Sequence, residues 1–143
     1  MIRNIRHTGI VVRDLDKAVK FYEGLGFSIL KRQIEKGPYI DKVVGINKVI
    51  IETAKLKSPC GYLLELLQYH SHPMEQTINN QSSNQLGWSH IAITVENIDD
   101  CLKYIRNNGG SIENKPISPP QGAMLVAYCH DIEGNLIEIV ESK

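Results

Sequence analysis

Two histidines and two glutamates are the residues of this sequence whose types and spacing are best suited to chemistry. His7 and His90 each open an alternating run rich in β-branched residues, and Glu65 and Glu138 lie between apolar residues in LLELL and LIEIV. A carboxylate in the middle of an apolar strand is costly to bury unless it is paired or bound to a cation. Two imidazoles and two carboxylates suit borderline divalent ions, namely Zn, Ni, Co, Mn or Fe. We therefore predict that His7, Glu65, His90 and Glu138 bind one divalent metal ion.

An internal repeat places the four residues at equivalent positions. With an offset of 83 residues, segment 7–26 aligns with segment 90–109, and six of the twenty positions are identical. With an offset of 73 residues, CGYLLELLQ aligns with EGNLIEIVE. The two histidines coincide under the first offset, and the two glutamates coincide under the second. A single histidine on a strand is more often structural, but the matched pairs favour metal ligands.

The two repeated segments each predict a strand followed by a helix. Alternation of β-branched residues predicts the strand. Asp14 and Asn97 are suited to cap the start of a helix, and apolar residues follow at helical spacing. Gly26 and Gly109 stand where each helix would end.

Alternation along the first strand also predicts the direction of its side chains. His7 shares a face with Gly9 and Val11, because successive side chains of a strand point to opposite faces. If Ile10 and Val12 pack on the helix, His7 points to the other surface of the sheet.

Two tight turns, SPCG and DIEG, are each predicted to join two further strands. The strands are 48–57 and 62–69 around SPCG, and 123–130 and 135–141 around DIEG. The sequence therefore predicts the α+β class. We expect one domain, 1–143, in which two βαβββ modules, 1–69 and 87–143, are joined by a polar linker, 70–86.

Composition limits the classes of partner. The 143 residues include 16 basic and 16 acidic side chains, so no basic field attracts nucleic acid or anionic lipid. No stretch resembles a signal peptide or a membrane span, which predicts a cytoplasmic protein without nucleic-acid or membrane partners. Three cysteines without CxxC spacing predict three reduced thiols.

The paired units, with His7, Glu65, His90 and Glu138 on their first and last strands, resemble the vicinal oxygen chelate (VOC) superfamily. This family includes glyoxalase I, methylmalonyl-CoA epimerase, extradiol dioxygenases and fosfomycin or bleomycin resistance proteins. The resemblance covers nearly the whole chain. It implies the glyoxalase/bleomycin resistance/dihydroxybiphenyl dioxygenase fold, in which two modules form a cupped mixed sheet around one divalent ion with two open positions. The ligand set is similar to that of bacterial glyoxalase I, whereas epimerases typically have Gln in place of Glu65 and extradiol dioxygenases lack that ligand.

The resemblance implies a divalent-metal-dependent lyase or isomerase of the glyoxalase I type. Such an enzyme transfers a proton at a carbon next to a metal-chelated carbonyl. Glu138 and Glu65 are the expected bases, because a ligand carboxylate is already within reach of the chelated substrate. The alternatives are a methylmalonyl-CoA epimerase-like enzyme, a metal-free small-molecule-binding protein of the antibiotic resistance type, and an extradiol dioxygenase-like enzyme. The resemblance also suggests a homodimer that binds a small-molecule substrate.

Several other residues are weaker candidates. His70 and His72 are expected to be solvated surface histidines, and His130 either lines the site or flanks the DIEG turn. Possible liners of the site are Tyr39, Lys48, Glu52, Lys55, Gln121 and Met124. Lys55, Lys57 and Lys115 are the basic residues available for an anionic thioester substrate.

Overall fold

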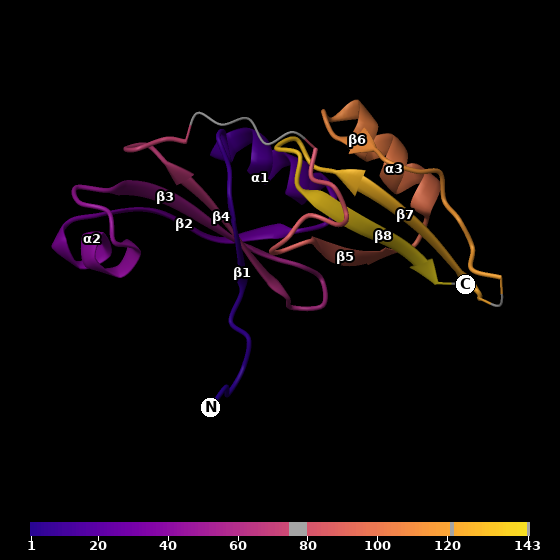
Figure 1. Cartoon of the computed structure of the whole chain (residues 1–143), viewed down its shortest axis with the longest axis horizontal. Helices are drawn as coiled ribbons and strands as arrows, with labels where there is room; N and C mark the ends of the chain where they lie inside the picture. Colours follow the sequence, from indigo (N-terminus) through magenta and orange to yellow (C-terminus); the bar gives the residue numbers. More distant parts are fainter. Residues whose placement is uncertain (75–79, 121, 143) are drawn as a thin grey trace. The chain divides into compact units, whose positions relative to one another are not determined.

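Two β-sheets of the same topology, one in each half of the chain, form the framework (Figure 1). The structure is a computed structural model that describes residues 1–74, 80–120 and 122–142. It divides into two compact units, Met1–Glu75 and Gln76–Lys143. The predicted pair of βαβββ units is confirmed.

The first unit contains a four-stranded mixed sheet and two helices. Its elements are β1 (Thr8–Val11), α1 (Leu15–Gly24), β2 (Ser28–Lys36), α2 (Pro38–Val44), β3 (Ile50–Lys57) and β4 (Leu63–Tyr69). The strand order is β1-β4-β3-β2, and only the β1–β4 pair is parallel. The first and last strands of the unit are therefore neighbours.

The second unit repeats this order with a much shorter second strand. Its elements are β5 (His90–Val95), α3 (Ile98–Asn107), β6 (Ser111–Ile112), β7 (Met124–His130) and β8 (Leu136–Ser142). The strand order is β5-β8-β7-β6, with β5 parallel to β8. The strand that corresponds to β2 has only two residues here.

The helix ends follow the predicted caps. The Asp14 carboxylate accepts a hydrogen bond from the Lys17 backbone N–H at 3.0 Å, and the Asn97 side chain accepts one from Asp100 at 2.9 Å. Past the end of α1, Gly26 adopts φ +100°, a left-handed conformation that favours glycine.

The last strand of each unit is tied to the start of its helix. The Gln68 side-chain oxygen on β4 accepts a hydrogen bond from the Leu15 N–H at 2.9 Å. At the equivalent position on β8, the Glu141 carboxylate accepts one from the Ile98 N–H at 2.8 Å. Both contacts satisfy a helix N–H that has no partner within the helix.

Each sheet carries its long helix on one face. In the first unit, α1 packs on β3 and β4, where Ala54, Leu56, Leu64 and Leu66 are fully buried. In the second unit, α3 packs on β6 and β7, and Ile137 and Ile139 are buried on the neighbouring strand β8. The odd-numbered residues of β7 and β8 therefore face the helix, and the even-numbered residues face the other surface of the sheet.

The short helix α2 was not predicted from the hydrophobic pattern, because its seven residues span only two turns. Pro38 at its first position and Gly45 after its last residue are the usual boundary signals. Within α2, the Asp41 carboxylate accepts hydrogen bonds from the backbone N–H groups of Lys48 and Val49 at 2.8 and 2.9 Å. These contacts hold Lys48 in a turn, so β3 begins at Ile50 and not at the predicted residue 48.

The predicted linker is only partly described, because residues 75–79 lie outside the described segments. Its later part is bound to the second unit. The Asn80 side chain donates a hydrogen bond to Ser111, and the Gln81 N–H donates one to the Gly134 carbonyl, each at 2.9 Å. Among the described residues, no helix is both long and apolar enough to cross a bilayer.

Candidate functional site

The first predicted pair of ligands comes together in the first unit. His7 directly precedes β1, and the parallel register places Gly9 opposite Glu65 of β4. His7 therefore shares a face with Glu65, and its Nε2 lies 3.0 Å from the Glu65 carboxylate. A Cβ at Gly9 would approach Leu67 Cδ1 to 3.3 Å, so a larger residue at this position would crowd β4.

The second pair repeats this geometry in the second unit. Ala92 lies opposite Glu138 in the parallel β5–β8 register, and His90 lies two residues earlier on the same face. The His90 Nε2 is 2.9 Å from the Glu138 carboxylate. In both pairs the side chains are partly exposed, at 32% and 14% for His7 and Glu65 and at 28% and 23% for His90 and Glu138.

A different residue stands beside each glutamate on the neighbouring antiparallel strand. Lys55 lies opposite Glu65, with its Nζ 3.5 Å from the carboxylate. Tyr128 lies opposite Glu138, and its ring meets the His90 ring edge to face at 5.2 Å. Burial, and then the nearby Glu138 carboxylate, raise the pKa of Tyr128. Tyr128 was missed in the sequence, although the offset of 73 residues places it on Lys55.

The donor atoms of each pair have a separation that suits a metal ion. Two ligands at right angles, each about 2.0–2.2 Å from one ion, are about 2.8–3.1 Å apart. The observed separations of 3.0 and 2.9 Å fall in this range, and they are equally those of a hydrogen bond between an imidazole and a carboxylate. Each pair lies within one unit. The structure contains no cluster of three or more His, Cys, Asp or Glu suited to a metal over residues 1–74, 80–120 and 122–142. The single four-ligand site thus stays a prediction.

Two of the remaining histidines make contacts of their own. The His70 Nε2 lies 2.8 Å from the Glu52 carboxylate. His130 is buried, and its two ring nitrogens lie 2.9 Å from the Gln81 carbonyl and 3.3 Å from the Ser111 hydroxyl. His72 is exposed, as predicted. The His130 contacts favour a structural role near the turn.

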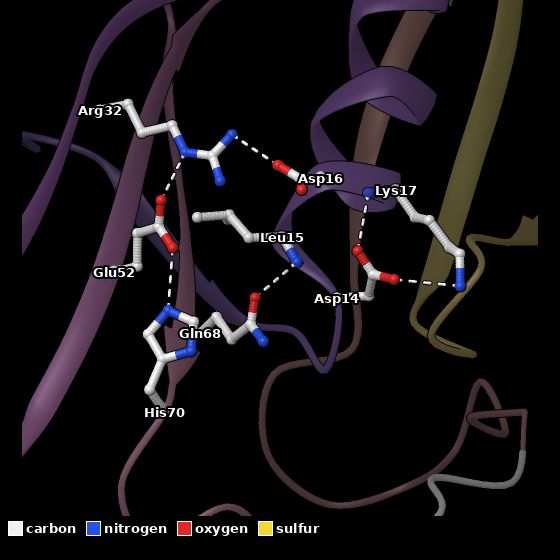
Figure 2. A network of polar contacts seen from close by, with 8 residues as sticks. All are labelled: Asp14, Leu15, Asp16, Lys17, Arg32, Glu52, Gln68 and His70. Atoms are coloured by element: carbon white, nitrogen blue, oxygen red, sulfur yellow. Dashed lines mark hydrogen bonds and ion pairs between the residues drawn. The ribbon is translucent and has the colours of Figure 1, made fainter.

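Glu52 lies on the helix-facing side of the first sheet, away from Glu65. It is three residues from Lys55 on β3, so the two side chains point to opposite faces. Figure 2 shows Glu52 between His70 and Arg32, whose Nε donates to the carboxylate at 2.7 Å. A second Arg32 nitrogen lies 2.7 Å from Asp16 of α1. Glu52 therefore belongs to a network that joins β2, β3 and α1, and it does not line the site.

This network predicts a pH-dependent contribution to stability. The Arg32 guanidinium, and then His70, lower the pKa of Glu52 below its usual value of 4.5. A carboxylate with a lowered pKa in the folded state stabilises the fold above pH 4.5, and this contribution is lost as the pH falls through the folded-state pKa. We expect Glu52→Gln to lower the free energy of unfolding by about 1 kcal/mol at pH 7.

Chemical denaturation of both proteins between pH 3 and 7 measures this effect. The difference between wild type and Glu52→Gln should be constant above the ordinary pKa of glutamate and should shrink below it. A difference that stays the same down to pH 3 would show that Glu52 acts through packing and not through its charge.

The other expected liners lie in several places. Tyr39 is exposed on α2, Lys48 is held in the turn before β3, and Met124 is exposed at the start of β7. Gln121 lies outside the described residues. Lys57 is exposed at the end of β3, and Lys115 lines a groove beside α3. Of the described residues in this set of expected liners, Lys55 alone contacts a predicted ligand.

Comparison with known proteins identifies the family. The family model described as Glyoxalase/Bleomycin resistance protein/Dioxygenase superfamily matches residues 4–139. A probable lactoylglutathione lyase of Synechocystis is 29% identical over 95% of this chain and 93% of its own length. A lactoylglutathione lyase of Haemophilus influenzae is 26% identical over 97% of this chain and 93% of its own. The crystal structure of a glyoxalase family protein from Bacillus cereus has a TM-score of 0.91 at 25% identity, over 99% of this chain and 95% of that one. The chain therefore belongs to the glyoxalase/bleomycin resistance/dioxygenase superfamily, also known as the vicinal oxygen chelate superfamily.

Proposed function

We propose that this protein is a divalent-metal-dependent lyase of the glyoxalase I type. Its substrate would be the adduct of a thiol with a 2-oxoaldehyde, and its product a 2-hydroxy thioester such as lactoylglutathione. The observation that carries the proposal is the matched His–Glu pair in each unit, with donor atoms 3.0 and 2.9 Å apart. The names of the relatives, lactoylglutathione lyase at 29% and 26% identity, support the reaction class.

His7, Glu65, His90 and Glu138 would together hold one metal ion. Either one chain or two chains of a homodimer would supply the two pairs. The bound ion would contribute positive charge beside two neighbouring substrate oxygens, which lowers the cost of the negative charge that develops there. Imidazole nitrogens and carboxylate oxygens are ligands for such an ion, and the two carboxylates balance its charge.

The carboxylates would also move the proton. In the proposed reaction, Glu138 takes the proton from the carbon bonded to sulfur and returns it to the adjacent carbonyl carbon. The hydroxyl proton of the first carbon passes to the former carbonyl oxygen, so the first carbon becomes the thioester carbonyl. Glu65 is the alternative base. Tyr128, packed against the His90 ring, would keep that imidazole oriented toward Glu138. Lys55 would hold the Glu65 carboxylate from the neighbouring strand.

Turnover of methylglyoxal with glutathione tests this proposal. We expect the purified protein to form the thioester, to lose this activity after treatment with a chelator, and to regain it with added divalent metal. The appearance of thioester is followed by its absorbance, with protein-free solution as the control. No thioester formation with any of the five metals, on protein of verified fold, would contradict the proposal.

Each alternative activity has its own readout. Deuterium exchange from heavy water into the carbon next to the thioester of methylmalonyl-CoA, without thioester synthesis from methylglyoxal, would indicate an epimerase. Ligand binding that is unchanged by the chelator, without any turnover, would indicate a metal-free binding protein. Consumption of oxygen with a catechol would indicate a dioxygenase.

A further inference from the structure

A groove of ≈ 830 Å³ lies beside α3 in the second unit, between this helix and the chain that leads from β6 to β7. Leu102, Ile112 and Leu125 contribute apolar surface to it. Leu125 is at an odd position of β7, on the side of the sheet that faces α3. Glu138 and Tyr128 point to the opposite side. The groove is therefore separate from the His90–Glu138 pair.

The groove lies where the second unit has only a short second strand. In the first unit, β2 has nine residues, and its Arg32 reaches across to Asp16 at the start of α1 (Figure 2). In the second unit, β6 ends after two residues, and the flank of α3 beside it stays open. Asp99, which matches Asp16 in the repeat, lines the groove.

The charges around the groove are mostly positive. It is lined by three cations, Lys103 and Arg106 of α3 and Lys115 of the facing segment. Asp99 contributes the one carboxylate among its lining residues. Within the described part of the chain, none of these three cations forms an ion pair. The groove thus has a net charge of +2 above an apolar surface.

The positive charge is specific to the second unit. Lys103 matches Lys20 in the repeat, but Arg106 matches Glu23. With Asp16, which matches Asp99, the corresponding flank of α1 carries two carboxylates and one lysine. Since the two helices otherwise share their capping and their buried face, the extra cations are not needed to fold a helix of this repeat.

We propose that this groove binds a phosphate monoester with an apolar body. A phosphate monoester carries a charge of about −1.5 to −2 at pH 7, which complements the net charge of the groove. Arg106 can bind two phosphate oxygens at once, and Lys103 and Lys115 add two further charged donors. The apolar body would lie on Leu102, Ile112 and Leu125.

Titration of the protein with phenyl phosphate, followed by amide chemical shifts in NMR spectra, tests the proposal. We expect saturable shifts in α3 and in the segment from Ile112 to Leu125. Inorganic phosphate, which lacks the apolar body, and benzoate, which carries less charge, should each bind more weakly. Arg106→Gln should weaken phenyl phosphate binding by about tenfold, the usual cost of one hydrogen bond to a charged group.

Lys20→Gln is the matched control, because it removes the equivalent lysine of the first unit. This variant should bind phenyl phosphate as the wild type does. Equal binding by the wild type and Arg106→Gln, or the absence of saturation, would overturn the proposal. Inorganic phosphate that binds as tightly as phenyl phosphate would overturn the apolar contact. All titrations use metal-free protein, so loss of the proposed lyase activity would leave their outcome unchanged.

Discussion

Replacement of His90 by alanine is expected to remove most of the bound divalent metal. His90 is one of four predicted ligands, and loss of a residue that merely supports a ligand already costs about 10–100-fold in metal affinity. We expect a loss of at least about 100-fold for His90→Ala. Metal analysis after equilibration with a weak competing chelator measures it. The fold should persist, because His90 is partly exposed and the core of the second unit is apolar.

His72→Asn is the control for this experiment. His72 is exposed and has φ +55°, a left-handed conformation that asparagine tolerates. The variant should retain its metal. Loss of metal from His72→Asn would instead point to the HxH pair of His70 and His72. Full metal content in alanine variants of all four predicted ligands would place the site elsewhere.

The same substitution tests whether two chains share one site. A His7→Ala chain and a His90→Ala chain are mixed, allowed to exchange subunits and assayed for bound metal. If the two histidines of a site come from different chains, a mixed dimer contains one intact site and binding is partly restored. If both come from one chain, no site is intact and binding stays low. A monomeric mass in light scattering at micromolar concentration would contradict the proposed homodimer.

Glu138→Gln is expected to lower turnover by about 100-fold or more, the usual scale of a general base. Glutamine keeps an oxygen that can bind metal, but it cannot accept the substrate proton. The loss of metal should therefore be smaller than the loss of turnover. Steady-state kinetics at saturating metal separates the two effects, and kcat should fall more than KM changes.

Glu141→Gln is a matched control on the same strand. Its carboxylate accepts the Ile98 N–H on the opposite face of β8, and Gln68 performs the same role in the first unit. Glutamine should therefore serve at position 141 and leave turnover nearly unchanged. An active Glu138→Gln variant would indicate that Glu65 is the base, and the corresponding Glu65→Gln variant would then test this assignment.

Local rules were sufficient for the repeated parts of the fold. The caps at Asp14 and Asn97 depend on hydrogen bonds between residues three positions apart, so they can be read from short segments. Helix α2 and the start of β3 were harder to predict from the sequence, because the carboxylate of Asp41 contacts residues seven and eight positions later. A loop closed by such a contact leaves no periodic pattern in the sequence.

The internal repeat was enough to predict the two βαβββ units, because a repeated pattern fixes the position of each residue within its unit. Strand alternation was enough to predict the face on which each predicted ligand lies. The groups that surround the predicted ligands follow from three-dimensional contacts. Strand register between distant segments places Lys55 beside Glu65 and Tyr128 beside Glu138, although the two glutamates are equivalent in the repeat. It also assigns Glu52 to the network with Arg32, and it leaves Arg106 beside an open groove where β6 ends early. These outcomes depend on which strands pair and how far each pair extends, and both are set by contacts between residues far apart in the chain.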